Sequence, residues 1–122
     1  MTSRVLCLAI DCHDSASLAR FWCAALGYAE VKRWKDPRGT EYVEIGRDGE
    51  PLLLFQPVPE QKSVKNRLHL DIYPATGSQQ SEVERLVTLG ATVVENDPDL
   101  HWIVLTDPEG NEFCVPPPRS AG

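Results

Sequence analysis

The residues best suited to chemistry lie in the short stretch "NRLHLDI", residues 66–72. If this stretch is a strand, alternation places Arg67, His69 and Asp71 on one face and three apolar side chains on the other. A histidine can transfer a proton or bind a metal near neutral pH, an aspartate can orient its ring, and an arginine can hold an anion. A strand whose outer face is only solvated would carry the same residues. Whether the stretch is a functional site or an ordinary surface depends on where its polar face points, and the neighbouring helices and strands determine that direction.

The composition excludes several classes of partner. The chain has 122 residues, 42% of them hydrophobic and 25% charged, which is typical of one globular domain. Its net charge of −6 disfavours nucleic acid and anionic membranes as partners. The longest apolar runs, such as "LLLF" at residues 52–55, are too short to span a bilayer. The opening segment "MTSRVLCLAIDC" also differs from a signal peptide.

We therefore expect a cytoplasmic protein. None of its four cysteines forms a Cys-x-x-Cys pair, and in a reducing compartment they should be free thiols. They are Cys7, Cys12, Cys23 and Cys114.

The two halves of the chain repeat one order of elements. In the first half, residues 4–10 are rich in branched and long apolar side chains and predict a strand. Asp14 is placed to cap a helix, and Gly27 is placed to end it. Three extended runs follow, over residues 29–34, 40–46 and 51–56.

The second half begins with a predicted strand over residues 67–73. A helix with a serine cap follows over residues 78–90, and Gly90 stops it just as Gly27 stops the first helix. Three further extended runs follow, over residues 91–96, 101–106 and 112–115.

Each half therefore reads strand–helix–strand–strand–strand. One half alone cannot cover both faces of its sheet, so pairing the halves is the physical solution. We predict a single α+β domain in which module one spans about residues 4–56, a connector spans 57–66, and module two spans about 67–115. The two βαβββ modules should form a curved eight-stranded mixed sheet around a cavity, with the helices outside.

This arrangement orients the opening stretch. The apolar face of the strand, with Leu68 and Leu70, should pack beneath the second helix, and the opposite face, with His69, should line the shared cavity. The alternative is a flat, solvated sheet face. Leu54 and Trp102 weaken that alternative, because they share the same strand rows and would be poorly placed in open water.

Four motifs carry a family resemblance: "FWCAALGY" (21–28), "KNRLHLDI" (65–72), "VERLVTLGATVV" (83–94) and "HWIVLTDPEGNEFCV" (101–115). In this order and spacing the chain resembles the glyoxalase-like branch of the vicinal oxygen chelate superfamily, which includes glyoxalase I and bleomycin-resistance proteins. The resemblance runs from Arg4 to Val115 and implies the paired βαβββ fold. It is less specific for an activity, since this fold hosts many chemistries.

The resemblance also implies positions for a metal. In metal-dependent members, one ligand comes from the first strand and one from the last strand of each half. These positions correspond to Cys7 and Gln56 in the first half, and to His69 and Cys114 in the second. Two thiolates, an imidazole and an amide oxygen would favour zinc as the divalent metal. The alternative is that both cysteines fill apolar space while His69 bonds Asp71 or Gln56.

His69 is the candidate catalytic residue, as an acid or base. The candidate ligand-pocket residues are Arg67, Asp71, Gln56 and Trp102. Arg67 suits an anion, although an ion pair that closes the connector against the sheet would explain it as well. Trp102 would stack on an aromatic ligand or simply fill the cavity.

The resemblance implies a glyoxalase-like protein that binds a small molecule. An enzyme of this kind would be a lyase, isomerase or dioxygenase acting on a hydroxy-carbonyl or diol compound, with a metal or with His69 as acid and base. The alternatives are a metal-free module that sequesters a compound, as antibiotic-resistance relatives do, and a ligand-sensing or structural module. Members of this fold commonly pair across exposed sheet edges, so we also expect a homodimer.

Overall fold

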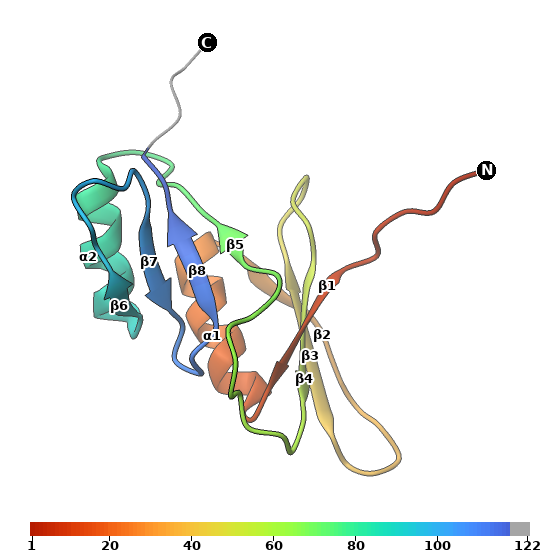
Figure 1. The fold of residues 1–122 in the computed structure, drawn as a ribbon. Coiled ribbons are helices and arrows are strands. Elements are labelled where there is room, and N and C mark those ends of the chain that lie inside the picture. The colour runs from red at the N-terminus through yellow and green to blue at the C-terminus, as the bar shows by residue number, and fades with distance from the viewer. Residues whose placement is uncertain (118–122) are drawn as a thin grey trace. The chain divides into compact units, whose positions relative to one another are not determined.

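The computed structural model describes residues 1–117 of the chain, and they form two compact units (Figure 1). The first unit ends at Gln61 and contains the predicted module one. The second unit begins at Lys62 and contains the predicted module two. This boundary falls inside the predicted connector. Each unit has the predicted order of one strand, one helix and three strands.

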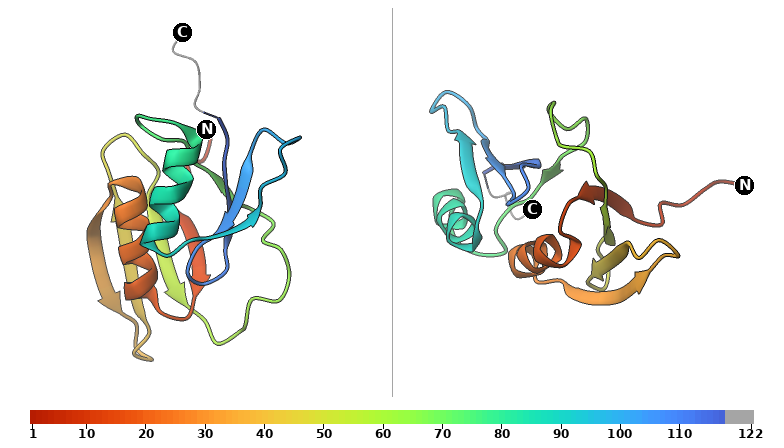
Figure 2. Two further views of the ribbon diagram at one scale, coloured as in Figure 1. Left: turned by 90° about the vertical axis from the view of Figure 1, so that its left-hand side faces the viewer. Right: turned by 90° about the horizontal axis from the view of Figure 1, so that it is seen from below.

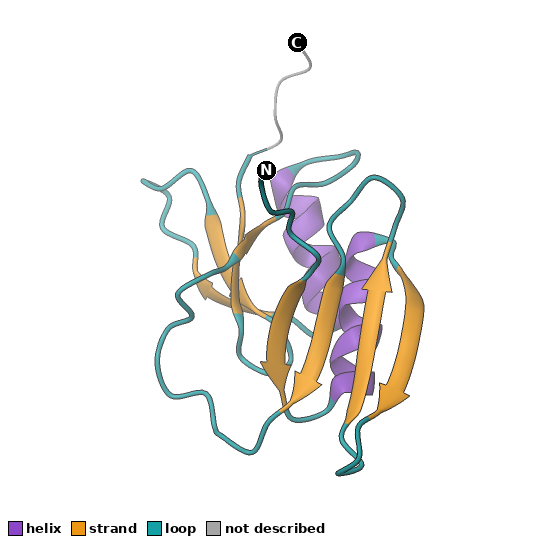
Figure 3. Ribbon diagram, turned by 90° about the vertical axis from the view of Figure 1, so that its right-hand side faces the viewer, coloured by secondary structure: helices purple, strands orange, loops and turns teal. Residues whose placement is uncertain are grey.

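Module one contains β1 (Leu8–Cys12), α1 (Ser15–Leu26), β2 (Ala29–Lys35), β3 (Glu41–Gly46) and β4 (Leu53–Pro57). Its strands form one mixed sheet in the order β1-β4-β3-β2, in which β1 runs parallel to β4 and the other pairs are antiparallel. Helix α1 lies across one face of this sheet, and the other face carries no helix of module one (Figure 3).

Local hydrogen bonds define both ends of α1. The carboxylate of Asp14 accepts a hydrogen bond from the backbone nitrogen of Ser17 at 3.1 Å, which makes Asp14 the N-cap. Gly27 ends the helix with a φ of 69°, a left-handed conformation that glycine adopts without strain. Between these ends, Leu18 and Trp22 point into the core. They pack above the buried strand residues Val43, Ile45, Leu53 and Phe55.

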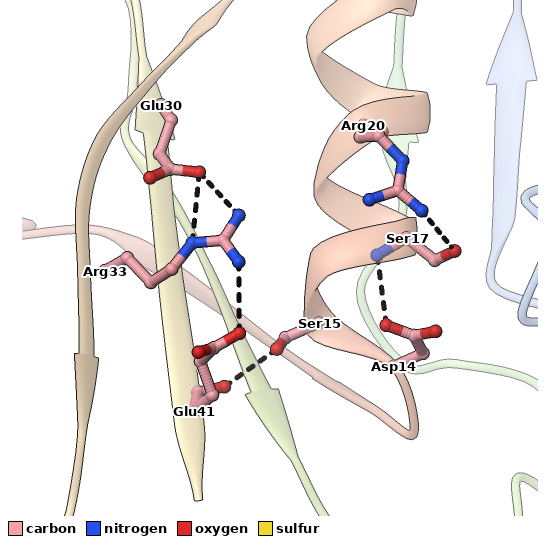
Figure 4. A network of polar contacts seen from close by, with 7 residues as sticks. All are labelled: Asp14, Ser15, Ser17, Arg20, Glu30, Arg33 and Glu41. Carbon is pink, nitrogen blue, oxygen red and sulfur yellow. Dashed lines mark hydrogen bonds and ion pairs between the residues drawn. The ribbon is translucent and has the colours of Figure 1, made fainter.

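The cap of α1 gives a first testable prediction. Asp14→Ala should lower the free energy of unfolding by about 1 kcal/mol, because the backbone N–H of Ser17 loses its acceptor (Figure 4). Ser17→Ala is the matched control, since it keeps that N–H and removes only an exposed hydroxyl that accepts from Arg20. Urea denaturation of both variants checks the difference. Equal losses in the two variants would contradict the capping role.

Module two contains β5 (Leu70–Asp71), α2 (Gln79–Leu89), β6 (Thr92–Glu95), β7 (Ile103–Thr106) and β8 (Glu112–Val115). Its mixed sheet has the order β5-β8-β7-β6, which is the order of module one repeated, with β5 parallel to β8 (Figure 2). Ser78 caps α2 through a reciprocal pair of hydrogen bonds with Ser81, and Gly90 ends the helix. Neither helix of the described residues is long and apolar enough to cross a membrane.

The predicted α+β class with two βαβββ modules is confirmed. Its eight strands are divided between two four-stranded sheets, which are not closed into a barrel. The division follows from the pairing in each module, where the first strand lies parallel to the last strand of the same module. That the whole chain is a single domain stays a prediction.

The first strand of each module differs most from the prediction. β1 begins at Leu8, later than expected, and β5 contains only Leu70 and Asp71. Leu68 lies before β5 and is 82% exposed, so the prediction that it packs beneath the helix is wrong. The reason is that backbone pairing with β8 starts only at Leu70, which lies opposite Phe113.

Candidate functional site

Three side chains that can carry protons or bind metals meet on module two. A ring nitrogen of His69, a carboxylate oxygen of Asp71 and the sulfur of Cys114 all lie within 4.8 Å of one another. Two elements position them. Asp71 on β5 lies directly opposite Cys114 on β8, and His69 comes two residues before Asp71. His69 Nδ1 is 3.2 Å from Asp71 Oδ1.

The cluster lies on the face of the sheet that α2 does not cover. On β8, Phe113 and Val115 are fully buried on the side where α2 packs, whereas Glu112 and Cys114 are half-buried and point the other way. The side chains of His69 and Asp71 are 36% and 63% exposed, so a small molecule can reach both. His69 and Asp71 therefore share the face that the alternation predicted, whereas Arg67 lies before β5.

The surroundings of Cys114 raise the pKa of its thiol. Partial burial raises the pKa of the Cys114 thiol above its usual value, and the Asp71 carboxylate raises it further, both by its charge and by accepting a hydrogen bond from the thiol. Glu95 adds to the increase, and Lys65 opposes it. The protonated thiol is therefore the favoured form of Cys114.

The corresponding place on module one holds a different pair. Asp11 lies opposite Gln56, as Asp71 lies opposite Cys114, and Gln56 Nε2 donates a hydrogen bond to Asp11 Oδ1 at 2.8 Å. Counted back from Asp11, the counterpart of His69 is Ala9. The strand register therefore does not allow both predicted correspondences at once, that of Cys7 with His69 and that of Gln56 with Cys114.

The structure does not bring Cys7 and Gln56 together within module one. Cys7 precedes β1, and the next residue, Leu8, donates its backbone N–H to the carbonyl of Leu52. Leu52 and Gln56 are four residues apart along an extended chain, a distance of about 13 Å. Gln56 and Cys7 are thus at opposite ends of the same strand pair.

Two further predicted pocket residues lie at the margins of the cluster. Arg67 is exposed, and within residues 1–117 it forms no ion pair. Lys62 makes the contact that closes the connector instead, with its Nζ 3.0 Å from a carboxylate oxygen of Glu112. Trp102 is 44% exposed and precedes β7, two residues before Val104, which lies opposite Cys114. Trp102 lies in a bend just outside the strand.

Sequence reasoning missed Glu95. It lies opposite Val104 after a register shift in β6, so Asp71, Cys114, Val104 and Glu95 form one row across the sheet. An acidic residue at the end of an edge strand carries no distinctive sequence signal. Only the shift between Val93 and Glu95 brings its side chain to this face.

The cluster fits a divalent metal. In a tetrahedral zinc site with ordinary bond lengths, neighbouring ligand atoms lie about 3.3–3.6 Å apart. The three donors already lie within 4.8 Å of one another, so small rotations of side chains that are at least partly exposed would close the set. A thiolate and an imidazole favour zinc over harder ions such as manganese.

A second concavity lies on module one, between α1 and β2, with a volume of about 500 Å³. Small residues of α1 and Arg33 of β2 line it. Arg33 is fixed by Glu30 at 2.7 Å and by Glu41 at 3.0 Å, so its charge is already balanced within the module (Figure 4). Arg20 and Cys23 of α1 also line the hollow, and Arg20 donates a hydrogen bond to Ser17 Oγ at 3.0 Å.

Comparison with known proteins identifies the family. Residues 7–116 match the model of the glyoxalase-like domain. The chain belongs to this family. The resemblance to the vicinal oxygen chelate superfamily is thereby confirmed. No curated protein shows a significant sequence match to the chain.

Solved structures of the superfamily share the fold of this glyoxalase-like protein. A variant of the fosfomycin resistance protein FosX from Listeria monocytogenes, complexed with Mn(II) and 1S,2S-dihydroxypropylphosphonic acid, has a TM-score of 0.77 at 13% identity, covering 95% of this chain and 93% of that one. Leishmania major glyoxalase I has a TM-score of 0.71 at 14% identity, covering 94% and 86%.

A glyoxalase/bleomycin resistance protein/dioxygenase family enzyme from Burkholderia phytofirmans has a TM-score of 0.67 at 20% identity, covering 90% of this chain and 94% of that one. At these identities the likeness shows the fold alone.

Proposed function

We propose that this glyoxalase-like protein binds a small hydroxy-carbonyl or diol compound on the helix-free face of module two, and that His69 transfers a proton in a lyase or isomerase reaction. The observation that carries the proposal is the contact of 3.2 Å between His69 Nδ1 and Asp71 Oδ1. A small rotation of the ring from this position would let Nδ1 donate a hydrogen bond to Asp71, which would leave Nε2 free as a base.

The chemistry follows from this arrangement. In a hydroxy-carbonyl compound, His69 Nε2 would take the proton from the carbon that bears the hydroxyl, and the electron pair of that C–H bond would move toward the carbonyl. The protonated ring would return this proton to the former carbonyl carbon, and the hydroxyl proton would pass to the former carbonyl oxygen, which completes an isomerisation with all atoms conserved. Asp71 would stabilise the charged ring during this step. In the alternative with a metal bound at the cluster, His69 would be a ligand rather than a free base, and the metal would polarise the carbonyl oxygen instead.

The fold neighbours support the class of ligand but not its identity. FosX is complexed with a dihydroxy compound, and the Leishmania major protein is a glyoxalase I. The exposed polar groups of the cluster suit a ligand with oxygen atoms at one end.

Dihydroxyacetone, a hydroxy-carbonyl compound, is the probe that tests the proposal. We expect calorimetry to detect saturable binding of dihydroxyacetone but not of acetone, which lacks the hydroxyl groups. In D₂O, the bound compound should exchange its carbon-bound hydrogens for deuterium faster than it does in buffer, as followed by proton NMR. Absence of binding for dihydroxyacetone would contradict the proposal.

One observation favours a second function, in which the module sequesters a compound without chemistry or metal. Burial and Asp71 raise the pKa of the Cys114 thiol, which disfavours the thiolate form that binds a metal. For sequestration, dihydroxyacetone would bind but its hydrogens would exchange no faster than in buffer. The same pair of measurements therefore separates the two functions.

We also infer that the protein forms a homodimer. The support is the edge strand β6, where all four residues are exposed and Val93 and Val94 contribute apolar surface. Light scattering at micromolar concentration should give twice the mass of one chain. Val94→Lys should then shift the protein toward the monomer, whereas a wild-type monomer would contradict the inference.

A further inference from the structure

We infer that module two binds zinc by itself, through His69, Asp71 and Cys114, with no ligand from module one. The inference concerns the same cluster as the proposed function and rests on it for a role in chemistry, where the metal would polarise the carbonyl oxygen of the bound compound in place of proton transfer by His69. It differs from the ligand arrangement that the family resemblance implies, in which each half supplies two ligands. Asp71 takes the place of the ligands that module one would have given.

The backbone of module two brings the three donors together without help from another element. The register of β5 and β8 sets Asp71 beside Cys114, and alternation returns His69 to the same face two residues earlier. The imidazole and carboxylate are already 3.2 Å apart, close to the spacing of neighbouring ligands on zinc. Binding one zinc ion requires only that the three donor atoms, which already lie within 4.8 Å of one another, move slightly closer together.

Module one lacks a matching pair of donors. Its residues at the corresponding positions, Asp11 and Gln56, satisfy each other through a hydrogen bond of 2.8 Å. Binding a metal there would break this bond and replace it with a contact to an amide oxygen, which is a weak ligand for zinc. Cys7, at the far end of the strand pair, cannot complete a set with Gln56.

The donor set also predicts which metal is preferred. One thiolate, one imidazole and one carboxylate favour zinc, whereas manganese prefers a set made of oxygen atoms. Three protein ligands leave a fourth position for water or a ligand oxygen, as in catalytic zinc sites. The exposure of His69 and Asp71 keeps that position accessible. Binding would displace the thiol proton of Cys114 to solvent.

Metal titrations of the full chain test the inference. Zinc affinity is measured by competition with a chromophoric chelator, and cobalt is used as a spectroscopic substitute whose charge-transfer absorption reports a bond to sulfur. We expect one zinc ion per chain, tighter binding of zinc than of manganese, and the sulfur absorption with cobalt. Circular dichroism confirms that each variant below remains folded.

Matched substitutions in the two modules make the test specific. Cys114→Ser should remove the sulfur absorption, and Cys114→Ser and Asp71→Asn should each weaken zinc binding at least about a hundredfold, because loss of an outer-shell partner alone costs ten- to a hundredfold. Cys7→Ser and Asp11→Asn are the controls and should leave the zinc affinity within about twofold of the wild type, since neither residue would contact the metal.

Two results would overturn the inference. If Cys7→Ser or Gln56→Ala weakens zinc binding as much as Cys114→Ser, module one supplies ligands. If the wild type binds zinc no more tightly than Cys114→Ser, the cluster is no metal site. Binding of dihydroxyacetone in the absence of zinc would leave the proposed function standing after such a failure. Zinc binding without binding of dihydroxyacetone would reject that function and retain the metal site.

Discussion

Phe113→Ala should lower the free energy of unfolding by about 3–5 kcal/mol, because it would leave a large cavity in the core of module two. Phe113 is completely buried on β8, between Leu70 of β5 and Leu105 of β7. Its ring lies on the side that α2 covers, and the next residue, Cys114, points to the opposite side. The stability of this strand therefore also fixes the position of the cluster.

Module one offers the matched variant. Phe55 is completely buried on β4 and precedes Gln56, as Phe113 precedes Cys114. Urea denaturation should show a loss of similar size for Phe55→Ala, whereas Tyr73→Ala, at an exposed position, should change stability by less than about 0.5 kcal/mol. A loss below about 1 kcal/mol for Phe113→Ala would mean that β8 is rotated and that Cys114 does not face the cluster.

His69→Ala should slow the deuterium exchange of bound dihydroxyacetone at least about a hundredfold, because a positioned general base contributes roughly that factor or more. The side chain is partly exposed, so its loss should change the melting temperature little. Exchange is measured by proton NMR at saturating dihydroxyacetone, which separates the loss of proton transfer from any loss of affinity.

His101→Ala is the control for this experiment. His101 is exposed and precedes β7, outside the cluster, so its removal should leave the exchange rate unchanged. Equal rates in the wild type and in His69→Ala would show that another group or the solvent removes the proton. His69 would then have at most a binding role.

The helix boundaries could be predicted because local hydrogen bonds determine them. Asp14 and Gly27 set the ends of α1, and Ser78 and Gly90 set the ends of α2, as their residue types indicated. No long-range contact is needed for these caps to form. The order of elements in each half followed from the same signals together with the apolar periodicity.

The length of the first strands could not be predicted from their composition. Residues 67–73 alternate over their whole length, yet only Leu70 and Asp71 pair with β8. The segment just before β5 is held by side chains instead, with the backbone nitrogen of Asn66 donating to Glu112 at 3.1 Å. Strand pairing depends on a partner far along the chain, and alternation alone does not report where that pairing begins.

The candidate site was predicted in its residue types but not in its grouping. His69, Asp71 and Cys114 were each selected from the sequence, whereas the contact of Asp71 with Cys114 depends on the register of two strands more than 40 residues apart in the chain. The same register separates Cys7 from Gln56, which the family resemblance had placed in one ligand set. The pairing of the strands, rather than the residue types, determines which side chains can bind the same metal ion or small molecule.

The most direct test of the central claim is a map of backbone amide chemical shifts in the full chain as dihydroxyacetone is added. If the helix-free face of module two is the binding site, the shifts should change most at residues 69–72 and 112–115, with smaller changes near Trp102. The amides of β1 and β4 in module one should then stay constant. Changes confined to residues 8–12 and 53–57, or no changes at saturating dihydroxyacetone, would contradict the account.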